Sequence, residues 1–155
     1  MSTWIGLIHL FAAAVWIGGM IYMNIVLMPS LAAIDPPQRG RLVGAVAKKF
    51  TIVSWLSVVA LASTGLLRTP GPLLFDTASP YGRLLTVKLL LFGVMIAIGA
   101  VITFGFAPKL HRFAPKPGEP PAREFLAAQR GVKLLSGTNT LLGVTVLVLV
   151  TVLRA

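Results

Sequence analysis

The stretch LLLFGVMIAIGAVITFGFA, from Leu89 to Ala107, holds nineteen consecutive residues without a single Asp, Glu, Lys or Arg. A helix needs roughly 20 predominantly apolar residues to cross the hydrocarbon layer of a bilayer. A membrane-spanning β-strand would instead alternate polar and apolar residues over about ten positions, and this stretch does not alternate. It therefore predicts a transmembrane helix.

Three further stretches lack charged residues in the same way, namely residues 1–34, 50–67 and 134–153. Each is long enough to span a bilayer, although the second is near the lower limit. We therefore expect an all-α membrane protein, folded as one domain over residues 1–155 into an antiparallel bundle of four transmembrane helices. The predicted helices cover residues 3–28, 46–68, 82–107 and 134–153.

The composition excludes most other classes of protein. Hydrophobic residues make up 56% of the 155 residues and charged residues only 12%, whereas a soluble domain is about 25% charged. The net charge of +10 would suit a nucleic-acid binder, but on so apolar a chain it is better explained as charge that flanks membrane spans. We expect the lipid bilayer, and no nucleic acid, as a partner. The lack of cysteine excludes disulfides, thiolate zinc sites and iron–sulfur clusters.

The basic residues predict the orientation, because short cytoplasmic loops are enriched in Lys and Arg. The two loops on one side carry ten of them: Arg39, Arg41, Lys48, Lys49, Lys109, Arg112, Lys116, Arg123, Arg130 and Lys133. The opposite side carries three: Arg68, Arg83 and Arg154. We therefore expect a multi-pass protein of the inner membrane with both termini on the outer, periplasmic side.

Two ionisable residues lie inside predicted spans, His9 in the first and Lys88 in the third. Such residues are costly in a membrane and indicate a functional site. Each lies six residues from the expected outer end of its helix, about 9 Å deep at the helical rise. Each also has an ordinary explanation: a lysine stem can reach the interface, and a histidine can hydrogen-bond a neighbouring helix. A shared polar pocket explains both residues at once.

A neutral His9 suits a transition metal or a haem iron, and Lys88 would then serve a propionate, a substrate carboxylate or a proton relay. Trp16 and Phe92 lie on the helical faces that continue from these two residues, so we expect them to line a cofactor. Gly18 and Gly19 would let helices approach closely, although ordinary packing explains them equally well.

Other candidate ligands do not gather around His9. Met20 and Met23 lie about 16–21 Å below it by helical rise, so we interpret the methionines as core filler rather than as copper ligands converging on His9. The second histidine, His111, falls on the opposite side of the membrane, which argues against a bis-histidine haem within one subunit. Near that same side we expect a structural contact between Asn24 and Asn139.

Four segments carry a family resemblance: HLFAAAVWIGGMIYMNIVLMPSL from His9, STGLL from Ser63, GRLLTVKLLLFGVMIAIGA from Gly82 and TNTLLGVTVLVLV from Thr138. They resemble the copper-resistance D (CopD-like) membrane domain, which implies a role in copper uptake or tolerance. The same positions are similar to the related HemJ family, which is linked to protoporphyrinogen oxidation and haem binding. In that family a histidine of the first helix and a lysine of the third are the functional pair, which would correspond to His9 and Lys88.

Three hypotheses follow. The first is copper homeostasis or transport, with His9 as the metal ligand near the outer face. The second is a b-type haem protein, or an oxidoreductase acting on porphyrin or quinone, with His9 as axial ligand and Lys88 as the assisting or catalytic group. The third is an accessory subunit of a larger complex. We therefore expect copper or haem b as the bound cofactor. Both a homodimer and a larger membrane complex are compatible with the chain.

Overall fold

The computed structural model describes residues 3–69, 71, 77–116 and 119–152. In this part of the chain the structure is helical and contains no strand. Four helical rods, Thr3–Ala33, Gln38–Arg68, Pro80–Arg112 and Arg123–Thr151, are long and apolar enough to cross a membrane. The predicted fold class, an all-α protein with four transmembrane helices, is confirmed.

The first rod joins α1 (Thr3–Ile21), the π-helical segment η1 (Tyr22–Leu27), α2 (Met28–Ser30) and a 3₁₀ turn (Leu31–Ala33). The second rod is α3 (Pro36–Arg68). The third joins α4 (Pro80–Ala100), the π-helical segment η4 (Val101–Phe106) and α5 (Ala107–Arg112), and the fourth is α6 (Arg123–Val152).

Two helices begin earlier than the charge-free stretches suggested. α3 starts at Pro36 rather than near residue 46, because Asp35 and the two prolines begin the helix before the apolar run. The Asp35 side chain makes no capping hydrogen bond there. α6 starts at Arg123 rather than near residue 134, so its first turns carry Arg130 and Lys133. Charged residues end a membrane span without ending a helix, which explains both differences.

The first and third rods repeat one layout. Each passes from an α-helix into a six-residue π-helical segment and then into a short helix with a proline as its second residue, Pro29 or Pro108. A proline lacks the N–H that its preceding turn expects and crowds the carbonyl four residues back, and the wider π turn relieves that crowding. His9 precedes η1 by the same number of residues as Lys88 precedes η4.

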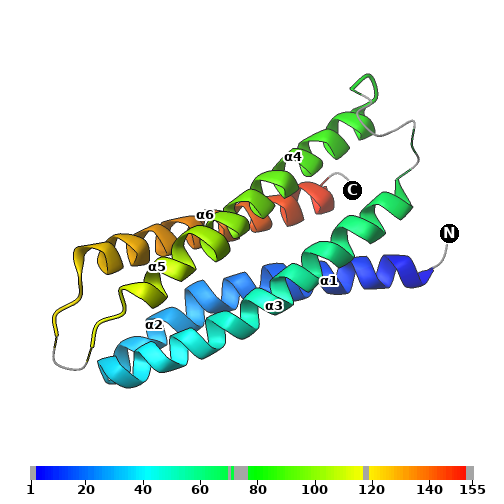
Figure 1. Cartoon of the computed structure of the whole chain (residues 1–155). Helices are drawn as coiled ribbons and strands as arrows, with labels where there is room; N and C mark the ends of the chain where they lie inside the picture. The colour runs from blue at the N-terminus through cyan, green and yellow to red at the C-terminus, as the bar shows by residue number, and fades with distance from the viewer. Residues whose placement is uncertain (1–2, 70, 72–76, 117–118, 153–155) are drawn as a thin grey trace.

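The rods form a bundle in which α1 packs along α3 and α4 along α6, while α1 also contacts α6 (Figure 1). α1 begins and α6 ends at one end of the bundle, which we call the termini end (Figure 1). At the opposite end, which we call the basic end, α3 begins and α5 is followed by α6 (Figure 1). The orientation of these two ends in the membrane stays a prediction.

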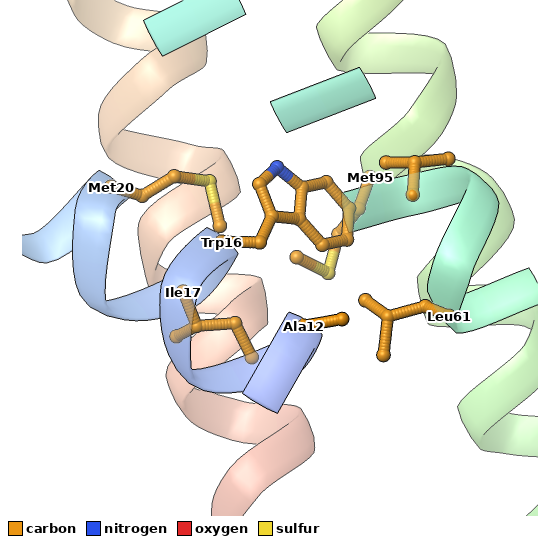
Figure 2. Close-up of a cluster of buried hydrophobic side chains, with 7 residues drawn as sticks. Ala12, Trp16, Ile17, Met20, Leu61 and Met95 are labelled. Atoms are coloured by element: carbon orange, nitrogen blue, oxygen red, sulfur yellow. The ribbon is translucent and has the colours of Figure 1, made fainter. Parts of the chain in front are cut away.

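Close packing of α1 on α3 depends on Gly19. A Cβ atom at Gly19 would lie 2.5 Å from the Phe50 ring, whereas one at Gly18 would meet nothing within 4 Å. Only one of the two glycines predicted to permit close approach therefore does so. Inside the bundle the buried cluster consists of Ala12, Trp16, Ile17, Met20, Val58, Leu61 and Met95 (Figure 2).

The outer surface of the bundle is apolar. Large hydrophobic side chains are exposed on each of the first three rods, for example Phe11, Leu56, Leu90 and Phe104. Hydrophobic side chains that face outward along whole helices suit a lipid environment, because lipid tails are as apolar as the side chains themselves. Polar side chains such as Ser57, Thr64 and Asn139 are buried instead.

Candidate functional site

His9 lies at the interface of α1 and α3. It belongs to the same face of α1 as the buried Ala12 and Trp16. Its Nδ1 atom is 2.8 Å from the hydroxyl oxygen of Thr64, a buried residue of α3. The next residue, Gly65, also lies against the ring, since a Cβ atom there would be in ordinary van der Waals contact with His9 Cε1, at 3.6 Å.

The hydrogen bonds of Thr64 favour one tautomer of His9. The Thr64 hydroxyl donates to the Ala60 carbonyl oxygen at 2.5 Å, and a hydroxyl has only one proton to donate. With that donation the Thr64 oxygen accepts from His9, which favours the tautomer with the proton on Nδ1 and the lone pair on Nε2. Histidines that bind metals are held in the same way, with one nitrogen donating to the protein and the other facing the metal.

Lys88 is half-buried on α4. It shares a face of that helix with the buried Leu85 and Met95 and with Phe92. Through the repeated layout it occupies on the third rod the position that His9 occupies on the first. The contacts described for His9 are with residues of α3. A functional pair of His9 with Lys88 stays a prediction.

Trp16 and Phe92, both predicted as site residues, are brought together by the fold. Their ring centroids are 5.9 Å apart and the ring planes are at 89°, an edge-to-face contact between α1 and α4. Trp16 is buried and Phe92 packs against the same cluster. The two rings fill the interior of the bundle on the side of His9 that faces the basic end.

A polar network joins α1 to α6 nearer the basic end. The Asn24 amide donates to the Met20 carbonyl at 3.0 Å and to the Thr140 hydroxyl at 2.9 Å, while Ser136 donates to Asn24 Oδ1 at 3.0 Å. Asn139 was therefore the wrong partner for Asn24, which hydrogen-bonds Thr140 and Ser136 instead. Asn139 comes directly before Thr140, and neighbouring residues of a helix lie about 100° apart around its axis, so the two side chains leave α6 in different directions.

Sequence reasoning did not single out Thr64 as a site residue. A signal was present, since Thr64 lies one helical turn before Arg68, the last residue of α3, and so near the outer end where His9 was expected. Polar residues of helices that run in opposite directions can be matched by depth in the same way as those of parallel helices.

The part of the chain that the structure describes contains no conventional metal-binding cluster. Within the described residues no three His, Cys, Asp or Glu side chains come close enough together to hold a metal ion. A groove of about 420 Å³ lies instead on α6 towards the basic end, lined by Arg130, Lys133, Leu134, Gly137, Thr138 and Leu141. That groove contains none of the predicted site residues.

Comparison with known proteins gives one match. The family model described as Copper resistance protein D matches residues 44–153, which is more than half of the chain. The matched region includes Thr64, Lys88 and Phe92 and begins after α1, so it does not cover His9 or Trp16. No curated protein and no solved structure matches the chain.

Proposed function

Because the chain belongs to the copper resistance protein D family and has four helices able to cross a membrane, we propose that it handles copper ions within the inner membrane, with His9 as the first ligand. The copper ion is the cargo of the protein. The observation that carries this proposal is the hydrogen bond between His9 Nδ1 and Thr64, because the tautomer that it favours has the lone pair of the imidazole on Nε2.

His9 suits a copper ion at this position for two reasons. A neutral imidazole is a good ligand for copper and costs far less to bury in a membrane than a carboxylate. Its orientation is also held in advance by α3, so little side-chain freedom is lost when an ion binds.

Two cations near the termini end give the site a means of releasing the ion. The Arg68 guanidinium lies over α1, 3.5 Å from where a Cβ atom of Gly6 would be, and Gly6 is one turn from His9. Lys88 occupies the matching level on α4. Positive charges near a bound cation weaken its binding, so we infer that Lys88 shortens the time that copper stays on His9.

A b-type haem is the alternative cargo or cofactor. His9 Nε2 would serve as its axial ligand, and Lys88 would suit a propionate. A porphyrin, however, needs a flat slot beside the imidazole, and the Trp16–Phe92 pair fills the interior below His9. A copper ion needs no such slot, which is why we favour copper.

The experiment compares His9→Gln with His111→Gln, since His111 is an exposed histidine at the basic end. Copper binding to the purified protein and copper tolerance of cells carrying each variant are measured. We expect His9→Gln to bind less copper than the wild type and to lose copper tolerance, and His111→Gln to retain both. Unchanged binding and tolerance in His9→Gln would refute the proposal, and a Soret band in the wild-type absorption spectrum would favour haem.

A further inference from the structure

Met20 of α1 and Met95 of α4 converge on a single point of α6. The terminal methyl carbon of each side chain lies 3.3 Å from the place where a Cβ atom of Gly143 would be. Both methionines are buried, with exposed fractions of 5% and 2%. The Cγ2 methyl of Ile17 lies at the same distance from that point. Two thioether side chains from different helices therefore meet on one side of α6, at Gly143.

Trp16 completes this arrangement on the side of α1. It belongs to the same buried cluster as the two methionines. Figure 2 shows its indole drawn between the Met20 and Met95 side chains. An indole face attracts a desolvated cation more strongly than any other aromatic side chain.

A second, independent observation comes from Asn139. It lies one helical turn before Gly143 on α6, so the two residues share a face of that helix. Its side chain is only 5% exposed. Among the residues that the structure describes, its Oδ1 atom is a buried oxygen that accepts no hydrogen bond. Such an oxygen is costly, above all in a protein surrounded by lipid.

The neighbouring polar residues make this cost harder to explain by packing alone. Asn24, Ser136 and Thr140 satisfy one another through short hydrogen bonds, whereas Asn139 takes no part in that network. An acceptor without a partner, one helical turn from the point where two thioether side chains meet, is available to bind a cation.

We propose that Met20, Met95 and Asn139, packed against Trp16, form an internal Cu(I) site in the centre of the bundle. Thioether sulfur is a soft ligand that selects Cu(I) over the harder divalent ions. The Asn139 oxygen adds the dipole of an uncharged group. This proposal rests on the proposed copper function and deepens it, because it names the oxidation state of the cargo and a second stopping point.

His9 of the proposed outer site and Met20 of the proposed internal site lie on the same helix, α1. Met20 is eleven residues from His9 on α1, about 16 Å along the helix axis. A copper ion that leaves His9 towards the basic end therefore reaches the two thioethers after roughly half the thickness of a bilayer.

The test uses the full-length protein in detergent or lipid nanodiscs, with Cu(I) as the probe. Met20→Leu, Met95→Leu and the double variant conserve volume and so preserve the packing of the core. Met28→Leu is the matched control, because Met28 is partly exposed at the start of α2. Affinity is measured by competition with a chromophoric Cu(I) chelator, and sulfur ligation by X-ray absorption.

We expect the double variant to bind Cu(I) about tenfold more weakly or worse and to lose its sulfur scattering, while Met28→Leu behaves as wild type. His9→Gln should keep the sulfur scattering, which separates this site from the proposed outer site. Wild-type affinity and sulfur scattering in the double variant would overturn the internal site and leave the role of His9 standing.

A second measurement covers the case in which the double variant does not fold. The methionine methyl groups of the wild-type protein are labelled with ¹³C, and Ag(I) is added as a redox-inert substitute for Cu(I). The methyl resonances of Met20 and Met95 should shift and that of Met28 should not. Unshifted Met20 and Met95 resonances at saturating Ag(I) would overturn the proposal.

Discussion

The indole of Trp16 and the phenyl ring of Phe92 meet edge to face, with ring centroids 5.9 Å apart. This contact ties α1 to α4, two helices that are far apart in the sequence. Trp16 belongs to the buried cluster that contains Met20 and Met95, and Phe92 packs against that cluster. The contact therefore stabilises the bundle from within.

The Trp16–Phe92 contact should be measurable as a coupling energy. Edge-to-face pairs contribute about 0.5–1.5 kcal/mol beyond the area that they bury. We expect a double-mutant cycle with Trp16→Leu and Phe92→Leu, followed by unfolding in mixed micelles, to give a coupling of about 1 kcal/mol. A cycle of Trp4→Leu with Phe92→Leu is the control, since Trp4 is 73% exposed. Additive losses in the first cycle would contradict the edge-to-face contact.

Thr64→Val should damage the copper site without removing the ligand. Valine keeps the shape of threonine but cannot accept the His9 Nδ1 proton, so the imidazole loses its fixed tautomer and orientation. Loss of such a supporting hydrogen bond costs about 10- to 100-fold in metal affinity. Copper affinity and the ¹⁵N shifts of the His9 ring nitrogens would measure this change.

Two matched variants sharpen that experiment. Thr64→Ser retains the hydroxyl and should retain both the affinity and the tautomer. Thr69→Val removes a hydroxyl just after the end of α3 that donates to the Gly65 carbonyl of that helix, and should bind copper as wild type does. A Thr64→Val protein with unchanged ¹⁵N shifts would show that Thr64 does not determine the tautomer.

Asn24→Leu should destabilise the bundle through its network with α6. The Asn24 side chain hydrogen-bonds both Thr140 and Ser136, and hydrogen bonds between membrane helices contribute about 0.6 kcal/mol on average and up to about 1.7. We expect a loss of about 1–2 kcal/mol, measured by equilibrium unfolding in mixed micelles. Thr145→Val is the control, because the exposed Thr145 bonds only within its own helix, to the Leu141 carbonyl. Equal stability of Asn24→Leu and the control would refute a structural role for the network.

The sequence predicted what depends on local pattern. Charge-free stretches of sufficient length gave the four spans, since the bilayer sets that length. The inward placement of His9 and Trp16 followed from helical spacing, and both lie on the face of α1 that meets the rest of the bundle. The orientation and the pairing of His9 with Lys88 are still predictions, because both concern the membrane or a ligand rather than the folded chain.

The partners across helices could not be predicted, because they depend on how far each helix is rotated about its axis. Asn24 and Asn139 were paired because both lie near the same end of the bundle. The contact is made by the next residue of α6, Thr140, because of how far α6 is rotated about its axis. The methionines were judged by whether they reach His9, whereas the structure brings Met20 and Met95 together at Gly143. The repeated layout of the first and third rods was hidden as well, since the two helices share proline positions and few other side chains.

Gly19 and Gly18 offer a direct test of how α1 is rotated against α3. A methyl group at Gly19 would lie 2.5 Å from the Phe50 ring, a distance that forces the ring to move, while one at Gly18 would point into open space. Overpacking of this kind costs about 1–3 kcal/mol, and alanine is otherwise the better helix former by about 1 kcal/mol. We therefore expect Gly19→Ala to lower the free energy of unfolding and Gly18→Ala to leave it unchanged or raise it. Phe50→Leu should restore part of the loss in Gly19→Ala, because it removes the atoms that the new methyl group meets. If the two alanine variants proved equally stable in mixed micelles, the packing of Phe50 over Gly19 would be wrong, and with it the rotation that places His9 against Thr64.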